Sequence, residues 1–321
     1  MKEFYSHGKL LLSAEYLVLD GALALAIPTC YGQSMSVSTI PGSALEIFSY
    51  DKDGALWFEG QFNSEKMIAL SENLPDVFAI KKVDLSSIII STNASEPAQA
   101  LAKILITALF LNPGLSHEIK GKRVANHLEF PTNWGLGSSS TLVSNIALWT
   151  HTDPYLLLQH SFGGSGYDLA CARSESPLTY RITTGKPEVK PVEFNPPFKD
   201  QLFFVHLNQK QNSRSGIKAY HQNKKNTAAA IKEIEQITNE LIITQDLARF
   251  RQLMDTHEEI IAEVTGQETV KNHLFKDYQG SIKSLGAWGG DFILATGTDD
   301  GMSYFRDKGY KTILSYSEMT L

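Results

Sequence analysis

The chain of 321 residues is predicted to have an α+β fold in two domains. Short apolar runs typical of strands are separated by turn residues, and between them lie stretches in which apolar residues recur at helical spacing. Prolines gather at residues 187–197, where regular structure is expected to break. We therefore expect one domain over residues 1–185 and a second over residues 186–321.

Strands are expected first along the chain, and helices follow. Residues 17–27 predict two buried strands around a turn at Asp20 and Gly21. Ser95 is predicted to cap a helix whose body is residues 98–110, and another helix begins near Ser138. The other expected strands are residues 86–90, 126–130, 202–207, 292–295 and 311–316, and the other expected helices are residues 153–161, 301–308 and several within 216–270.

Composition and charge indicate the class of protein. The formal net charge of −6 disfavours nucleic acid as a partner. Residues 17–27 are too short to span a bilayer, and the first residues lack the apolar run of a signal peptide. Cys30 and Cys171 are isolated, as in proteins of reducing compartments. We expect a cytoplasmic monomer or homodimer that binds a small molecule and neither nucleic acid nor membrane.

A glycine-rich loop is the strongest single motif. Residues 131–140 read P-T-N-W-G-L-G-S-S-S and run from a strand into a helix. The first turn of a helix carries unpaired N–H groups and the positive end of the helix dipole, so it stabilises an anion. Gly135 and Gly137 would let a polyphosphate approach the backbone. The sequence lacks the lysine of a P-loop and the spacing of a dinucleotide fingerprint, and a plain turn capped by Ser138 is the alternative.

This motif resembles the phosphate-binding motif of the GHMP kinases, and two further motifs follow the family's order. Residues 8–19 resemble the G-K-…-G-E-Y-x-V-L stretch of phosphomevalonate kinases, with Ala14 in place of a glycine. Residues 283–291 resemble the third glycine-rich motif of the family, with Trp288 where a glycine is usual. The three motifs in this order span nearly the whole chain.

The resemblance implies a fold, an activity and cofactors. The fold would be the two-domain GHMP kinase fold, with an N-terminal ribosomal-protein-S5-like α+β domain and a C-terminal ferredoxin-like α+β domain. The activity would be that of an ATP-dependent phosphotransferase, with ATP and Mg²⁺ as cofactors. Mg²⁺ neutralises charge on the phosphate oxygens during transfer.

The resemblance also implies roles for particular residues. Asp168, in a G-S-G-x-D segment, would orient the acceptor hydroxyl and take its proton, with Lys9 in support. Without the motifs, Asp168 reads as a turn cap and Lys9 as a solvated strand residue, and Glu15 fits a structural role equally well. The ATP-binding residues would be Gly135, Leu136, Gly137, Ser138, Ser139 and Ser140, with Ser139 also binding the metal. The substrate-binding residues would be Glu15, Ser165, Arg214, Gly289 and Gly290.

Two variant positions indicate the acceptor. Tyr16 and Asp291 favour phosphomevalonate, and mevalonate or a sugar comes next. Arg214 lies in a basic segment, residues 208–218, where it would grip a phosphate or carboxylate unless that loop is simply solvated. Leu157 stands about where mevalonate kinases carry a metal-binding glutamate. Diphosphomevalonate decarboxylase, which shares the fold, and a non-catalytic metabolite-binding member are the remaining alternatives.

Overall fold

The computed structural model describes residues 1–209, 213–223, 227–286, 288 and 290–321, except for the side chains of residues 81, 213–215, 219 and 223. The chain divides into two compact units. Unit 1 comprises Met1–Gly8, Tyr31–Pro131 and Gly137–Arg173, and unit 2 comprises Lys9–Cys30, Thr132–Leu136 and Ser174–Leu321. Because this division follows contacts rather than chain order, the domain boundary expected at residue 185 stays a prediction.

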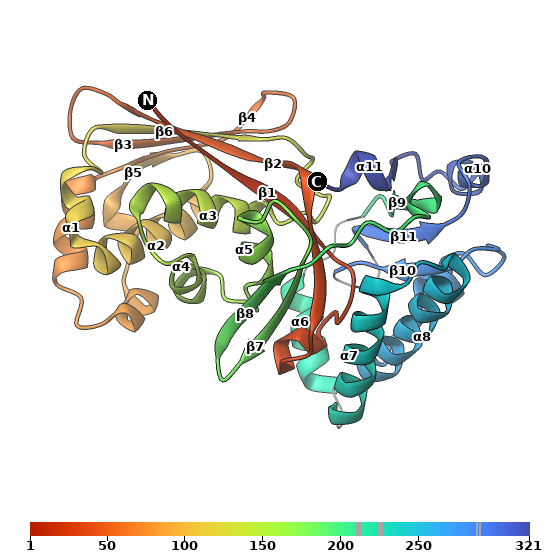
Figure 1. Ribbon diagram of the computed structural model, residues 1–321. Coiled ribbons are helices and arrows are strands. Elements are labelled where there is room, and N and C mark those ends of the chain that lie inside the picture. Colours follow the sequence, from red (N-terminus) through yellow and green to blue (C-terminus); the bar gives the residue numbers. More distant parts are fainter. Residues whose placement is uncertain (210–212, 224–226, 287, 289) are drawn as a thin grey trace. The chain divides into compact units, whose positions relative to one another are not determined.

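Unit 1 is a sheet covered by helices (Figure 1). Its strands are β1 (Lys2–Leu11) and β2 (Ala24–Thr39), which both continue in unit 2, then β3 (Leu45–Tyr50), β4 (Leu56–Phe62), β5 (Ile89–Thr92) and β6 (Lys122–Leu128). Its helices are α1 (Ser64–Glu72), α2 (Ser95–Leu111), α3 (Ser138–Thr150), α4 (Pro154–Ser161) and α5 (Tyr167–Ala172), with short 3₁₀ helices at Val77–Lys82, Ser86–Ile88 and Pro113–His117.

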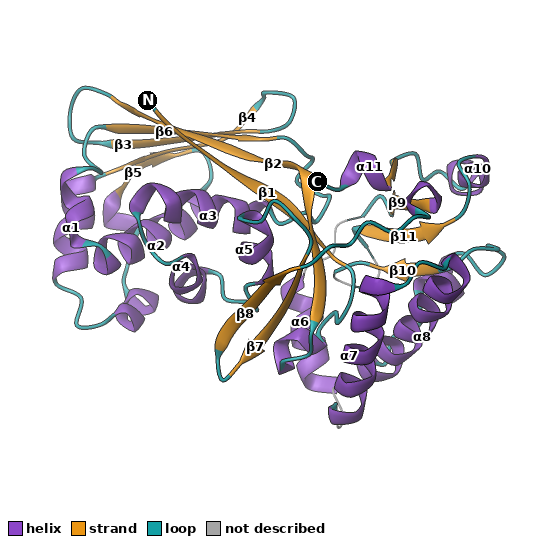
Figure 2. Cartoon of the chain, viewed as in Figure 1, coloured by secondary structure: helices purple, strands orange, loops and turns teal. Residues whose placement is uncertain are grey.

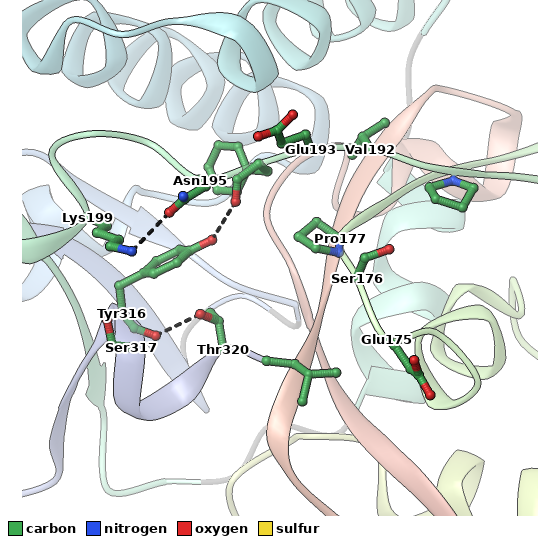
Figure 3. Close-up of a pocket in the computed structure, with 13 residues that line it drawn as sticks. Glu175, Ser176, Pro177, Val192, Glu193, Asn195, Lys199, Tyr316, Ser317 and Thr320 are labelled. Atoms are coloured by element: carbon green, nitrogen blue, oxygen red, sulfur yellow. Dashed lines mark hydrogen bonds between the residues drawn. The ribbon is translucent and has the colours of Figure 1, made fainter.

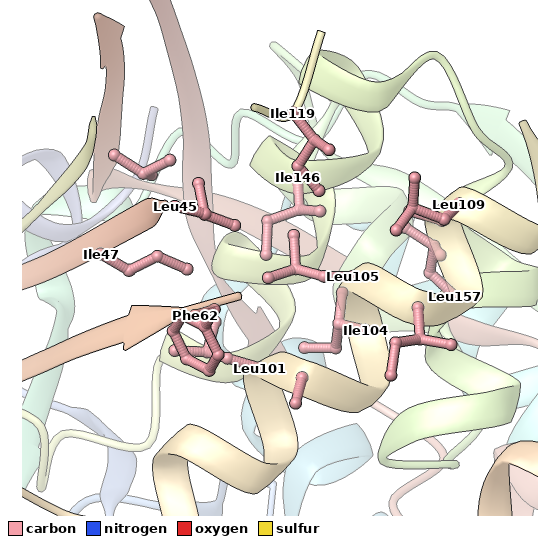
Figure 4. Close-up of a cluster of buried hydrophobic side chains, with 14 of the residues drawn as sticks. Leu45, Ile47, Phe62, Leu101, Ile104, Leu105, Leu109, Ile119, Ile146 and Leu157 are labelled. Carbon is pink, nitrogen blue, oxygen red and sulfur yellow. The ribbon is translucent and has the colours of Figure 1, made fainter. Parts of the chain in front are cut away.

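The strand order in unit 1 is β5-β4-β3-β6-β2, and β3 and β6 run parallel. Ile47 pairs with Val124, which pairs in turn with Val37, so these three side chains form one row across the sheet. Alternate strand residues face the same side, and this side packs against Leu105 and Ile146 of the helices (Figure 4). The buried cluster fixes the sheet against α2 and α3.

Unit 2 contains a hairpin and a second sheet (Figure 2). Its strands are β7 (Leu178–Thr183), β8 (Lys186–Pro191), β9 (Leu202–His206), β10 (Ile282–Ser284), β11 (Phe292–Thr296) and β12 (Ile313–Ser315). Its helices are α6 (Ser213–Asn223), α7 (Ala228–Ile243), α8 (Leu247–Thr265), α9 (Val270–Leu274), α10 (Ser303–Asp307) and α11 (Tyr316–Met319), with 3₁₀ helices at Leu17–Asp20, Lys199–Gln201 and Asp300–Met302.

The second sheet has the order β10-β11-β9-β12, and every pair in it is antiparallel. Numbered along the chain within this sheet, the order is 2-3-1-4, with helices after the first and third strands. This β-α-β-β-α-β arrangement is ferredoxin-like. Helix α8 contacts β10, and Val205, Phe275 and Phe305 lie in the core on this sheet. The predicted α+β fold class is confirmed.

Several expected elements are confirmed, and others are wrong in detail. Helices α3 and α4 and strands β9 and β11 lie where they were predicted. Residues 17–20 form a 3₁₀ helix instead of a strand, because Ala14 and Tyr16 have positive φ angles of 66° and 62° that bend the chain. Ser95 does not cap α2: the N-cap is Ala94, whose backbone is extended.

Three strand predictions also need correction. Residues 86–88 form a 3₁₀ helix before β5, and β6 begins at Lys122 and ends at Leu128, ahead of the predicted residue 130. Tyr316 begins α11, because Ser315 and Glu318 form a capping box there. Among the described residues, no helix combines the length and apolar character needed to cross a bilayer.

Candidate active site

The glycine-rich loop leads from β6 into α3, as predicted. Gly135 and Gly137 have φ angles of 68° and 88°, a region that favours glycine. Gly137 is the N-cap of α3, so no side chain caps this helix. The N–H groups of the first turn, including those of Ser138 and Ser139, have no acceptor within an α-helix. The backbone therefore presents donors and the positive end of the helix dipole at this loop.

The three serines differ in exposure. Ser138 is half-buried, Ser139 is exposed and Ser140 is buried. Ser139 therefore presents its hydroxyl to solvent at the start of α3. Of the three, it is the serine best placed to meet a ligand from outside the protein.

Helix α3 is fixed within unit 1 by buried polar side chains. The Ser6 hydroxyl of β1 bonds to Ser144 at 2.9 Å and to Asn145 at 2.8 Å. Thr141 donates to the Gln33 side chain at 2.6 Å, and Asn145 donates to the Gln33 carbonyl at 2.8 Å. Because these partners are buried, the helix N-terminus is held on a rigid support.

Lys9 meets the glycine loop and the third motif within unit 2. Its N–H donates to the carbonyl of Leu136 at 3.1 Å. A Cβ atom placed on Gly286 would lie 3.9 Å from the Lys9 ammonium nitrogen. The structure thus brings together Lys9, the first half of the glycine loop and the start of the third motif. They border a small cavity of about 10 Å³ lined by Lys9, Leu10, Leu11, Trp134, Gly135, Leu285, Gly286, Asp291 and Phe292.

Gly135 is required by a direct neighbour. A Cβ atom at Gly135 would lie 2.3 Å from the Asp291 carboxyl carbon, closer than any real contact. Asp291 itself has a φ of 54°, and its backbone bonds to Leu207 at 2.8 Å and to Gln209 at 2.9 Å. The Asp291 carboxyl therefore rests against the glycine loop, and its position is set by β9 and the residues that follow it.

The turn of the first motif is strained and held from several sides. Ala14 and Tyr16 both have positive φ angles, which cost roughly 1–3 kcal/mol each in non-glycine residues. The Ser13 hydroxyl accepts bonds from the Leu25 N–H and the Thr238 hydroxyl, both at 2.8 Å. Contacts from β2 and α7 thus hold the turn, and Glu15 adds further contacts.

Glu15 is fully buried in an ionic cluster. Its carboxylate lies 2.6 Å from the Lys283 ammonium, whose side chain is 1% exposed. The second Glu15 oxygen lies 3.3 Å from Nε2 of His257, and that nitrogen accepts the Ala14 N–H at 2.9 Å. An imidazole nitrogen that accepts a hydrogen bond carries no proton, so His257 is neutral and does not form an ion pair with Glu15.

Burial dominates the titration of this cluster. It raises the pKa of Glu15, against the attraction of Lys283. It raises the pKa of Glu258, which lies 3.7 Å from Lys283, to about 7. It lowers the pKa of His257 well below 6.5, and Lys283 adds to this shift. The cluster therefore combines a neutral imidazole with two carboxyl groups whose pKa values are raised by burial.

Tyr16 extends the first motif towards the third. The Tyr16 hydroxyl accepts the backbone N–H of Trp288 at 3.2 Å, and burial raises the pKa of Tyr16. Its ring stacks on Tyr220 of α6 at 5.5 Å, and the Tyr220 hydroxyl donates to Asp20. A Cβ atom at Gly216 would lie 2.8 Å from the Tyr16 hydroxyl. Tyr16 thus joins α6 to the third motif, and this α6 contact depends on a glycine.

Asp168 and Ser165 lie in unit 1, and Lys9 lies in unit 2. Asp168 is half-buried in the first turn of α5, and Ser165 lies in the loop before it. Gly164 and Gly166 have φ angles of 116° and 88°, so this loop depends on glycine for its conformation. The predicted pairing of Lys9 with Asp168 remains a prediction.

The other predicted substrate residues lie around the third motif and α6. Gly290 is buried beside Asp291. Gly289 lies outside the described residues. Arg214 belongs to the first turn of α6, and its side chain lies outside what the structure describes. Roles for these residues, and direct substrate binding by Glu15, stay predictions.

The residues that surround Glu15 were not predicted from the sequence. Lys283 opened the third motif, but it was given no role. His257 lies on the buried face of α8, at helical spacing from Phe250, Met254 and Ile261. A polar residue on an apolar helical face is a usable signal for a buried contact. It does not name the partner, which here is the backbone of the first motif.

A larger cavity, of about 700 Å³, lies elsewhere in unit 2 (Figure 3). Two of the side chains that line it bond to other lining residues: Tyr316 donates to the Phe194 carbonyl at 3.0 Å, and Lys199 donates to Asn195 at 3.1 Å. None of the predicted site residues that the structure describes lines it. The small cavity beside Lys9, in contrast, is lined by residues from all three motifs.

No protein-family model matches the chain, and no curated protein matches its sequence. Solved structures match over nearly its whole length. Mevalonate kinase of Methanococcus jannaschii is 14% identical, with a TM-score of 0.65, covering 100% of this chain and 98% of that kinase. Phosphomevalonate kinase of Streptococcus pneumoniae, in complex with phosphomevalonate and AMPPNP, is 14% identical, with a TM-score of 0.67, covering 98% and 100%.

Galactokinase of Lactococcus lactis, complexed with galactose, is 13% identical, with a TM-score of 0.63, covering 100% of this chain and 93% of that kinase. At such identities the likeness is one of fold. The chain therefore has the two-domain α+β fold of the GHMP kinases, as the three sequence motifs implied.

Proposed function

We propose that the chain is an ATP-dependent kinase that phosphorylates a small metabolite. The observation that carries this proposal is the glycine loop, where Gly135 and Gly137 take left-handed backbone angles directly before the uncapped N-terminus of α3. A loop of this kind offers N–H donors to a polyphosphate without Cβ atoms in the way. The fold shared with solved kinases supports the same activity.

The residues present fit a nucleotide with its metal ion. The first-turn N–H groups and the Ser138 hydroxyl would hold phosphate oxygens. Mg²⁺ takes only one or two protein ligands beside phosphate and water oxygens, and the exposed Ser139 hydroxyl supplies one. When bound, Mg²⁺ neutralises charge on the β- and γ-phosphate oxygens.

The chain's own residues would act on the acceptor. Asp168 would orient an acceptor hydroxyl and hold its proton as the bond to phosphorus forms. Lys9 would stabilise the anionic form of Asp168 and the charge on the acceptor oxygen. If the acceptor is a phosphate monoester, it already carries about −1.5 to −2 charge, so the cations Lys9 and Arg214 would matter more than a base.

Among acceptors we propose phosphomevalonate first, because Tyr16 and Asp291 are the variants seen in that branch of the resemblance. The solved phosphomevalonate kinase is among the fold relatives, as are a mevalonate kinase and a galactokinase. The test is ADP release from ATP with phosphomevalonate, mevalonate and galactose as single acceptors. Turnover with none of these acceptors would contradict the proposal.

Two variants distinguish the mechanisms. For a hydroxyl acceptor, Asp168→Asn should lower kcat at least about 100-fold, since a positioned base contributes about 10²–10⁴ in rate. For a phosphate acceptor, Lys9→Met should be the more damaging change. Lys2→Met is the matched control, because Lys2 lies on the same strand and pairs with Glu118 at 3.0 Å instead. Equal losses in Lys2→Met and Lys9→Met would remove the role of Lys9.

A non-catalytic member is the second candidate, and Trp288 favours it. Its bulky side chain is buried in the third motif, where the resemblance expects a glycine. Calorimetry with AMPPNP separates the two proposals: tight binding without ADP release from ATP supports the non-catalytic reading. Release of carbon dioxide with diphosphomevalonate would instead identify the decarboxylase.

A further inference from the structure

Three buried ionisable side chains that the proposed chemistry does not use surround Glu15. They are His257, Glu258 and Lys283, which are 0%, 3% and 1% exposed, and all belong to unit 2. Glu15 itself is 0% exposed. Ionisable groups are rarely buried in this way unless they are paired or used.

Lys283 lies between the first motif and α8. Its ammonium donates to Glu15 at 2.6 Å and to the Ser284 carbonyl at 3.0 Å, and it lies 3.7 Å from the Glu258 carboxylate. The other Glu258 oxygen accepts the Ser284 hydroxyl at 3.0 Å. An ammonium has three N–H groups, so Lys283 is directed to the first motif, to its own strand and to α8.

His257 holds the backbone of the same turn. Its Nε2 accepts the Ala14 N–H at 2.9 Å, so the ring is neutral and leaves Lys283 as the cation against Glu15. The turn places Tyr16, whose hydroxyl accepts the Trp288 N–H at 3.2 Å. A chain of contacts thus runs from α8 through Lys283 and Glu15 to the third motif.

The cluster is not fully hydrogen-bonded. Glu15 Oε2, Glu258 Oε1 and His257 Nδ1 are buried without a hydrogen-bond partner in the described part of the chain. A cluster retained for stability alone would be expected to satisfy such groups, since apolar side chains of the same shape often serve as well. The strained φ angles of Ala14 and Tyr16 provide a reason for the cluster, because a strained turn keeps its conformation only when contacts from other segments hold it.

We propose that Lys283 is a positioning residue that holds Glu15 in place. Glu258 lies beside the Lys283 ammonium, and His257 accepts the Ala14 N–H. Together these contacts fix the strained turn that places Tyr16 against the third motif. The inference rests on the proposed kinase function for its activity readout. Lys283 touches neither substrate nor nucleotide in this role. It acts through Glu15 and the backbone of residues 14–16.

The test compares two substitutions of Lys283. Lys283→Met keeps the aliphatic stem and removes the charge, and it should lower kcat about 100-fold, the size expected when an active-site group is misplaced by about 1 Å. The Kd for AMPPNP should stay within about threefold, because the glycine loop is untouched. Lys283→Arg keeps a cation and should recover at least about a tenth of wild-type kcat.

Arg251→Met is the matched control. Arg251 is also a cation of unit 2, but it lies on α8 and donates to Thr296 of β11 at 2.9 Å. Its kcat should stay within about twofold of wild type. A folded Lys283→Met protein with wild-type kcat, or an equal loss in Arg251→Met, overturns the inference. If Lys283→Met does not fold, Glu258→Gln is tested in its place. A pH profile of kcat that is the same in Glu258→Gln as in wild type then overturns the inference.

A second readout does not depend on turnover. The chain has four tryptophans, so 5-fluorotryptophan labelling gives four ¹⁹F resonances, and Trp288→Phe assigns the one of interest. The Trp288 resonance should move in Lys283→Met and stay in place in Arg251→Met. If wild-type protein phosphorylates no acceptor, the proposed function fails and this resonance alone decides the positioning role. A resonance that Lys283→Met leaves unmoved removes that role.

Discussion

The Lys283 ammonium lies 2.6 Å from the Glu15 carboxylate, and both side chains are closed off from solvent. The two residues are 268 positions apart in the sequence. The contact joins the first motif to the start of the third. A buried pair of this kind adds little stability relative to well-packed apolar residues, but breaking it from one side is costly.

Removing the Lys283 charge should therefore destabilise the protein. Lys283→Met leaves Glu15 without its cation, and we expect the free energy of unfolding at pH 7 to fall by about 3–5 kcal/mol. Urea denaturation measures this change through the midpoint and slope. Lys283→Met combined with Glu15→Gln removes both charges and should recover most of the loss. A double variant as unstable as the single one would show that the charges are not coupled.

Stability should also depend on pH through Glu258. Burial raises its pKa from 4.5 to about 7 in the folded chain. Between pH 4.5 and about 7, the folded state binds more protons than the unfolded chain, so the free energy of unfolding falls as the pH rises. The contribution of protonated Glu258 is complete below about pH 4.5 and is lost as the pH rises through about 7.

Glu258→Gln should abolish this pH dependence, which is worth about 3 kcal/mol across the range. The measurement is the difference in unfolding free energy between wild type and variant at several pH values. His257 has the opposite sign, because its lowered pKa favours the folded state above pH 6.5, and this term cancels in the difference. Glu259→Gln, at the exposed neighbouring position on α8, should leave the wild-type curve unchanged.

Local sequence patterns were enough to predict much of the fold. The glycine loop, α3 and the strands β9 and β11 follow from patterns within a few residues of one another. The 3₁₀ helix at Leu17–Asp20 could not be predicted, because Ala14 and Tyr16 take left-handed backbone angles that residues of these types seldom adopt. Contacts from distant segments impose that turn.

The candidate site divides in the same way. Lys9, Gly135 and Gly286 were recognised by motif, and the structure brings them together. The partner of Glu15 could not be found, because the chain has 29 lysine and arginine residues and their spacing does not show which of them is buried. His257 and Lys283 reach Glu15 only through the packing of α8 and β10 against the first motif.

Gly135→Ala should damage the loop. The new Cβ atom would lie 2.3 Å from the Asp291 carboxyl carbon, on a backbone with a φ of 68°. We expect AMPPNP binding to weaken at least about tenfold, because a displacement of about 1 Å is felt strongly in a preorganised site. Gly54→Ala is the control that separates backbone strain from the clash with Asp291. Gly54 has a similar φ of 79°, but nothing lies within 4 Å of the new Cβ atom. Adding Asp291→Ala to Gly135→Ala should restore part of the affinity, and no restoration would exclude the clash.

Ser139→Ala should raise the Mg²⁺ requirement of the reaction. Its hydroxyl is exposed in the first turn of α3, and its loss removes one of the one or two protein ligands that Mg²⁺ takes. We expect the Mg²⁺ concentration for half-maximal ADP release to rise about tenfold, equivalent to about 1.4 kcal/mol. Saturating Mg²⁺ should recover most of kcat. Ser95→Ala is the control, because Ser95 is likewise an exposed first-turn serine, in α2, with a non-glycine N-cap before it. A Ser139→Ala protein with the wild-type Mg²⁺ dependence would show that Ser139 is not a metal ligand. The phosphate oxygens would then suffice to hold the ion beside the loop without this hydroxyl.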